Sequence, residues 1–121
     1  MTAANTRLKI QSTNGLAEIL TQNSVALAFK TDAGTGSGTE RLRIDPGGQV
    51  LPGADDARNL GSSTKRWANI YAADMHFSNE GKTNDVDGTW GDWTLQEGED
   101  SIYMINNRTG KKYSITMKEV N

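Results

Sequence analysis

The chain has 121 residues, of which 35% are hydrophobic and 7% aromatic, and a formal net charge of −2 at pH 7. The slight acidity and the scattered Lys and Arg residues argue against nucleic-acid binding, and the absence of cysteine excludes disulfides, thiolate metal sites and thiol nucleophiles. No apolar run reaches membrane-span length and the start lacks the apolar core of a signal peptide, so we expect a protein made in a cytoplasm without membrane insertion.

Few large side chains are available for a core, because much of the hydrophobic fraction is alanine. Frequent Gly, Ser, Thr and Asn residues favour short strands and turns over a helical bundle. We therefore predict a mainly β fold of short antiparallel strands and hairpins. Oligomerisation is a usual remedy for a chain with so little core.

The first third of the chain alternates apolar and polar residues, as half-buried strands do. Leu8 and Ile10 alternate with polar residues within 6–11, and further strands are expected at 16–20 and 25–30. The Asn14–Gly15 dipeptide accepts the positive φ of a tight hairpin. These signals predict a hairpin followed by a third strand.

The glycine-rich run at 32–38 precedes a strand at 39–45, a turn at 46–48 and a short strand at 49–51. The run lacks the Lys and Ser/Thr that complete a phosphate-binding loop. We interpret it as a surface loop. Leu42 and Ile44 share one side of the predicted strand at 39–45.

Residues 63–72 contain the largest apolar cluster of the middle of the chain. The run Ser-Ser-Thr at 62–64 suits a helix N-cap. Trp67, Ile70 and Tyr71 follow at i, i+3 and i+4, so they would share one face of a helix. We predict a short helix at about 63–72 whose three apolar side chains plug a core between two modules. Such a helix needs tertiary or quaternary packing to be stable.

A strand around Met75 and Phe77 precedes the polar stretch 79–91, where we place a boundary. This gives a β-rich N-terminal module over 1–78 and a small C-terminal module over 79–121. Within the second module we expect a strand at 92–96. Residues 101–106 should pair with 112–117 as a hairpin across a glycine-containing turn.

Two stretches resemble bacteriophage tail-fibre and related virion structural proteins. The first is 59–72, with the pattern LGSS…RW…IY, preceded by RLRI at 41–44 and GQVLPG at 48–53. The second is 78–120, with NDVDGTWG at 84–91 and NNRTGKKY at 106–113, which is similar to the closing module of virion proteins of tailed phages, particularly those of cyanobacteria. The first pattern is a scaffold motif and names no ligand.

The resemblance implies an intertwined homotrimer whose strands wind into a shared spike or knob. It implies a place on the virion, in the tail, after assembly in the host bacterial cytoplasm, and contact with other virion proteins. Several relatives carry a self-cleaving chaperone domain, but its Ser and Lys motif is missing here, so no catalytic residue is carried over. The structural and interface residues are Leu42, Ile44, Leu60, Trp67, Ile70 and Tyr71.

Metal ligands are weakly indicated. Asp85 and Asp87 precede a glycine as in calcium loops, but Thr83 and Thr94 stand at the first and twelfth ligand positions, so an Asx-type turn is preferred. His76 is the only histidine, and it would meet other copies only at the axis of a trimer. We expect no metal and no other cofactor.

Trp90, Asp92 and Trp93 are candidate receptor or glycan contacts, because aromatic faces and carboxylates suit sugars. The preferred alternative is that Trp93 packs in the core of the last module and Trp90 covers a loop. The acids at 97, 99 and 100 crowd one turn and do not define the two flanks of a glycosidic bond.

We therefore expect a non-enzymatic, trimeric tail-fibre or tail-tip component that aids attachment to a surface glycan or protein receptor of a bacterial host. A head fibre, a capsid decoration protein and a neck or tail adaptor are alternatives of the same structural class. A fragment of a glycan depolymerase is the alternative from another class, and the missing separated acid pair weighs against it.

Overall fold

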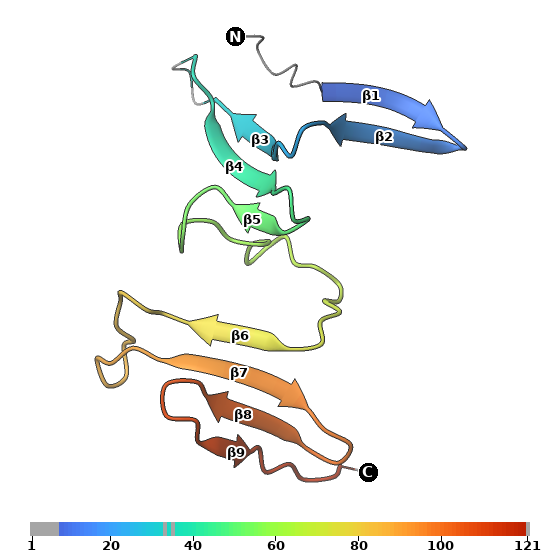
Figure 1. Cartoon of the computed structure of the whole chain (residues 1–121). Helices are drawn as coiled ribbons and strands as arrows, with labels where there is room; N and C mark the ends of the chain where they lie inside the picture. Colours follow the sequence, from blue (N-terminus) through green and yellow to red (C-terminus); the bar gives the residue numbers. More distant parts are fainter. Residues whose placement is uncertain (1–7, 33, 35, 121) are drawn as a thin grey trace. The chain divides into compact units, whose positions relative to one another are not determined.

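In a computed structural model of the chain, the described residues are 8–32, 34 and 36–120. They form nine strands in three antiparallel sheets and no helix (Figure 1). The predicted mainly β fold of short antiparallel strands is therefore confirmed. Thr6 and Arg7 of the first predicted strand lie outside the described residues. The described part contains no apolar helix of membrane-spanning length.

The contacts of the chain divide it into two units, Met1–Arg66 and Trp67–Asn121. The first unit holds a two-stranded and a three-stranded sheet, and the second holds a four-stranded sheet. The boundary expected after residue 78 falls between strands β6 and β7, which pair with each other in the second unit. The strand around Met75 and Phe77 thus lies with the C-terminal strands.

The first sheet is a hairpin of β1 (Leu8–Thr13) and β2 (Leu16–Thr21). Asn14 and Gly15 connect the strands with φ values of 51° and 80°, so the predicted tight turn is confirmed. Ile10 lies opposite Ile19 on one face, and Leu20 lies opposite Lys9 on the other. The hairpin therefore presents apolar side chains to solvent on both faces.

The second sheet consists of β3 (Leu27–Thr31), β4 (Thr39–Ile44) and β5 (Val50–Pro52), in that order. Residues opposite one another in an antiparallel sheet project from the same face. Two rows of such residues run across one face of this sheet, and all of their members are apolar: Leu27, Ile44 and Val50 in one row, and Phe29, Leu42 and Pro52 in the next.

A β-bulge in β4 gives the other face of this sheet its charge pair. Phe29 lies opposite Leu42 but Lys30 lies opposite Glu40, so the register shifts by one residue. Glu40 is thereby moved to the face of Arg43, and their side chains form a bidentate ion pair with Nε–Oε1 and Nη2–Oε2 distances of 2.6 and 2.9 Å. The hydrogen bonds from Arg43 lower the pKa of Glu40, and Glu40 raises the pKa of Arg43.

The third sheet contains β6 (Met75–Ser78), β7 (Asp92–Glu97), β8 (Ile102–Asn106) and β9 (Lys112–Ser114), in that order (Figure 1). Strands β8 and β9 form the predicted hairpin with shorter strands than expected. The amide of Gly110, which has a φ of 71°, donates to the carbonyl of Asn106 at 2.8 Å and closes the turn.

No apolar side chain is buried among residues 9–12, 14–32, 34 and 36–120. Among these residues only Thr94, a polar one, is buried, with 4% of its surface exposed. The sheets are thus held by their backbone ladders and by local side-chain contacts, while their apolar faces remain open. The composition predicts a small core, and the structure has an even smaller one than we expected.

The predicted helix at 63–72 is wrong. Ser62 Oγ and the Ser62 carbonyl both accept hydrogen bonds from the Lys65 amide, at 3.0 and 3.3 Å, which makes a cap-like turn. No helix follows it, because Trp67, Ile70 and Tyr71 are weak helix formers and a helix of this length is too short to be stable without packing. Trp67 is 63% exposed and Tyr71 94% exposed, so the predicted plug does not form within a single chain.

Candidate functional site

One candidate surface is a face of the third sheet, which we call the apolar face. Met75, Leu95, Met104 and Tyr113 form one row across its four strands. Phe77, Trp93 and the polar Asn106 form the row on one side of it, and Ile102 with the charged Glu97 lies on the other side. Period-two alternation within each strand places these side chains together. Met75, Phe77 and Tyr113 remain exposed, and Trp93, Leu95 and Met104 are half-buried.

Aromatic rings connect the strands of the apolar face. The ring centroids of Trp93 and Tyr113 lie 5.7 Å apart with an interplanar angle of 46°. Their strands are not neighbours, because β8 runs between β7 and β9. The pair therefore spans the strand that separates them and stiffens this face of the sheet.

The opposite face of the sheet carries a polar network centred on the buried Thr94. Thr94 Oγ1 lies 3.0 Å from His76 Nδ1 and accepts a hydrogen bond from Asn107 Nδ2 at 2.9 Å. The same Asn107 nitrogen donates to Asp92 Oδ1 at 2.8 Å. The network ties together β6, β7 and the turn after β8, which satisfies the buried hydroxyl.

The loop at 79–91 is organised by Asn84 and Asp87. Asn84 Oδ1 accepts the amides of Val86 and Asp87 at 2.8 and 3.0 Å, and Asn84 Nδ2 donates to Asp87 Oδ1 at 2.7 Å. Asp87 Oδ1 also accepts hydrogen bonds from the amide and hydroxyl of Thr89. This is the geometry of an Asx-type turn.

Asp87 and His76, which the sequence analysis considered as metal ligands, both take part in hydrogen bonds within the chain. The donors of Asn84 and Thr89 hold the pKa of Asp87 below its ordinary range, so the carboxylate serves as an acceptor for the loop. His76 lies in the network of the opposite face, in hydrogen-bond distance of Thr94. Among residues 8–32, 34 and 36–120, no three His, Asp or Glu side chains gather as a metal-binding group.

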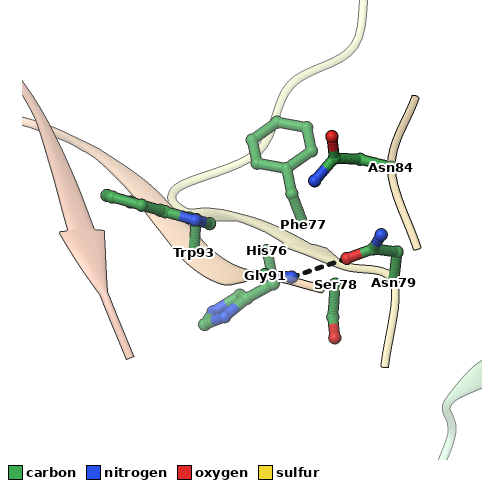
Figure 2. A pocket seen from close by; sticks show the side chains of 7 residues that line it. All are labelled: His76, Phe77, Ser78, Asn79, Asn84, Gly91 and Trp93. Atoms are coloured by element: carbon green, nitrogen blue, oxygen red, sulfur yellow. Dashed lines mark hydrogen bonds between the residues drawn. The ribbon is translucent and has the colours of Figure 1, made fainter. Parts of the chain in front are cut away.

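A surface pocket of about 500 Å³ lies where the loop meets the edge strand β6 (Figure 2). Figure 2 shows Phe77 projecting from β6 in the opposite direction to His76 and Ser78. Asn79 Oδ1 accepts the Gly91 amide at 2.7 Å, and Asn84 is occupied by the loop. The side-chain amides of Asn79 and Asn84, which line this pocket, thus form hydrogen bonds that stabilise the loop. The pocket is a result of the way in which the loop folds.

The three candidate receptor contacts are placed differently. Trp93 belongs to the apolar face, while Asp92 projects to the opposite face and is bound by Asn107. Trp90 lies in the loop, where the guanidinium carbon of Arg108 is 3.8 Å from its ring centroid and Arg108 Nη1 donates to its carbonyl at 2.8 Å. The structure does not bring these residues together as one platform.

The predicted interface residues fall into two groups. Leu42 and Ile44 lie together in the apolar rows of the second sheet. The other four belong to the segment between the second and third sheets, and all are exposed: Leu60, Trp67, Ile70 and Tyr71.

Thr94 and Asn107 were missed by reasoning from the sequence. Thr and Asn are common in strands and turns, so their types carry little signal. Alternation within 92–96 does place Thr94 on the face opposite Trp93, but the partner beyond the β8 turn is visible only in the fold.

Comparison of the chain with protein-family models, with curated proteins and with solved structures gave no significant match.

Proposed function

We propose that this chain is a non-enzymatic structural subunit of a bacteriophage virion, a homotrimeric tail-fibre-like or tail-tip component that aids attachment to the bacterial host. The observation that carries the proposal is the complete lack of buried apolar side chains among the described residues. A chain with three ordered sheets and no core of its own gains its stability from other chains.

The exposed area supports the same conclusion quantitatively. Two compact units of half this mass would together expose about 7,700 Å², even without any contact between them. The chain exposes 10708 Å². The excess of about 3,000 Å² per chain is in the range that obligate assemblies bury, and it exceeds what a weak transient contact covers.

The first hairpin supports an intertwined arrangement. Ile10 is 79% exposed on one of its faces, and Leu16 is 62% exposed on the other. A two-stranded hairpin is marginal by itself in water. Both faces of this one need cover, which a position between neighbouring chains supplies.

The trimeric state and the virion location rest on the resemblance of the LGSS…RW…IY segment and of the C-terminal stretch to tail-fibre proteins. In this proposal the exposed side chains of Trp67, Ile70 and Tyr71 are interface residues between chains. The subunit assembles in the host bacterial cytoplasm, docks on other virion proteins and contributes to binding a surface glycan or protein receptor.

The location is tested by immunogold labelling of intact particles with antibodies raised against the purified chain. We expect gold particles at the tail, and blocking of host adsorption by the same antibodies. Labelling of the head would replace the tail assignment with that of a head fibre or capsid decoration protein. Particles without any label would contradict a virion role.

A further inference from the structure

The turn between β1 and β2 contains the only asparagine of the 121 residues that is followed by glycine. Asn14 and Gly15 form this turn with φ values of 51° and 80°, and both residues are exposed. A Cβ atom added at Gly15 would meet nothing within 4 Å beyond the adjoining residues. In the described part of the chain, no group forms a hydrogen bond with the Asn14 side chain or with the Gly15 amide. The side-chain amide and the backbone nitrogen that follows it are therefore both open to reaction.

We propose that Asn14 is a site of spontaneous deamidation, at which the folded chain slowly converts this asparagine into aspartyl and isoaspartyl products. First the Gly15 nitrogen forms a bond to Cγ of Asn14, and the bond between Cγ and Nδ2 breaks. The proton lost from the Gly15 nitrogen leaves with Nδ2 as ammonia, and a five-membered succinimide ring remains. The reaction does not require the proposed virion role.

Water completes the reaction without any oxidant or reductant. It adds to one of the two ring carbonyl carbons, and the bond from that carbon to the Gly15 nitrogen breaks. The water supplies the new oxygen and the proton that returns to nitrogen. Opening at Cγ gives the aspartyl product, and opening at the main-chain carbonyl carbon of Asn14 gives the isoaspartyl product.

The glycine at position 15 favours the first step. It has no Cβ atom to hinder the approach of its nitrogen to Cγ of Asn14. Each of the other asparagines is either the last residue or is followed by a residue with a side chain. Asn59 is exposed in the same way but precedes Leu60. Exposure together with a following glycine thus distinguishes Asn14.

The related dipeptide Asp87–Gly88 shows what protects such a site. An aspartate before glycine can form the same ring, with water in place of ammonia as the leaving group. Asp87 Oδ1, however, accepts hydrogen bonds from Asn84 Nδ2 at 2.7 Å and from the amide and hydroxyl of Thr89 at 3.0 and 2.8 Å. These bonds fix the carboxylate and favour its ionised form, which is a poor electrophile. Asn14 has no such protection.

The isoaspartyl product changes the first hairpin. Its backbone runs through Cβ and Cγ of residue 14, which lengthens the turn by one atom. Turn length sets the register of a hairpin, and Thr13 lies opposite Leu16 across the two turn residues. Because a two-stranded hairpin is marginal in water, we expect this product to separate β1 from β2. The aspartyl product keeps the turn and adds a negative charge.

Mass spectrometric peptide mapping of the full chain, sampled during incubation in mildly alkaline buffer, tests the proposal. We expect the peptide with Asn14 to deamidate at least about tenfold faster than the peptide with Asn59, because only Asn14 precedes a residue without a Cβ. Both aspartyl and isoaspartyl products should accumulate, since the ring opens at either carbonyl. Equal rates at the two asparagines, or an aspartyl product without an isoaspartyl one, would overturn the proposal.

Two variants separate the chemistry from the fold. Gly15→Ala should slow the conversion of Asn14 at least about tenfold, because the new Cβ hinders the nitrogen. Alanine strains the turn at a φ of 80°, but an opened turn leaves Asn14 more exposed, so loss of the hairpin does not account for a slower reaction. An unchanged rate in this variant would contradict the mechanism.

Asn14→Gly keeps a residue that accepts positive φ and removes the side-chain amide. The mass change in this peptide should disappear, while amide exchange of β1 and β2 stays at the wild-type rate. A mass change that persists in the variant would place the reaction at another residue and overturn the assignment to Asn14.

Discussion

Trp93 and Tyr113 contact each other across an intervening strand, with ring centroids 5.7 Å apart. Strand β8 separates their strands, and Met104, which pairs with Tyr113, shares their face. Aromatic pairs of this kind contribute beyond the area they bury. The pair therefore contributes to the stability of the third sheet within a single chain.

Truncation of the outer ring tests this contact. Tyr113→Ala should lower the free energy of unfolding by about 1–3 kcal/mol per chain, because the aromatic contact and part of the apolar area are lost. Tyr113→Phe keeps the ring and should lie close to wild type. Urea denaturation at one fixed chain concentration measures both, since the stability of an oligomer depends on concentration. An unchanged midpoint for Tyr113→Ala would contradict the account.

The buried hydroxyl of Thr94 gives a second prediction. Thr94→Val keeps the shape of the side chain but leaves Asn107 and His76 without the oxygen they share. We expect a loss of about 1–3 kcal/mol in unfolding free energy, as for other unsatisfied buried polar groups. Thr94→Ser restores the hydroxyl and should recover most of that loss. If valine and serine behave alike, the network has no structural importance.

The loop at 79–91 should respond to acid through Asp87. Its pKa is lowered in the folded chain by hydrogen bonds from Asn84 and Thr89. The carboxylate therefore stabilises the loop above the ordinary aspartate pKa of about 3.9, and this contribution is lost as the pH falls through the lower folded value. The backbone amide resonance of Thr89 should shift in that acidic window, with little change in global stability because the group is exposed.

The matched variant for the acid response is Asp87→Asn, which has no carboxylate to protonate. Its Thr89 amide resonance should show no transition in the same pH range. A transition of equal size in the variant would assign the response to another group.

The exposed Trp67 tests the interface role of the segment between the sheets. Trp67→Ala should raise the concentration at which the oligomer dissociates by at least about tenfold, because buried tryptophans dominate many interfaces. The side chain is 63% exposed in the single chain, so its removal takes little from the packing within that chain. Lys65→Ala is the control. Unchanged dissociation would remove Trp67 from the interface.

Much of the strand pattern could be predicted from the sequence, because alternation and turn residues act locally. Both predicted hairpins are present. The first turns at the Asn14–Gly15 dipeptide, and the C-terminal one has Gly110 in its turn. The separation into three sheets could not be predicted, since it depends on which edges remain unpaired. The bulge beside Arg41, which moves Glu40 to the face of Arg43, left no signal in the alternation.

The helix shows where such reasoning fails. The spacing of Trp67, Ile70 and Tyr71 at i, i+3 and i+4 fits a helix, yet all three lie exposed in a segment without a helix. Periodicity reports which side chains can share a face if a helix forms, but not whether the chain has a surface to hold that face. The candidate site could likewise be predicted only in part. Alternation within the strands identifies the apolar positions, but the network around Thr94 depends on contacts that form after folding.

Sedimentation equilibrium of the purified full chain tests the central claim most directly. The account predicts one species of about three times the 13.1 kDa chain mass, unchanged over a broad range of micromolar concentrations. A stable, folded species of 13.1 kDa over the same range would contradict it.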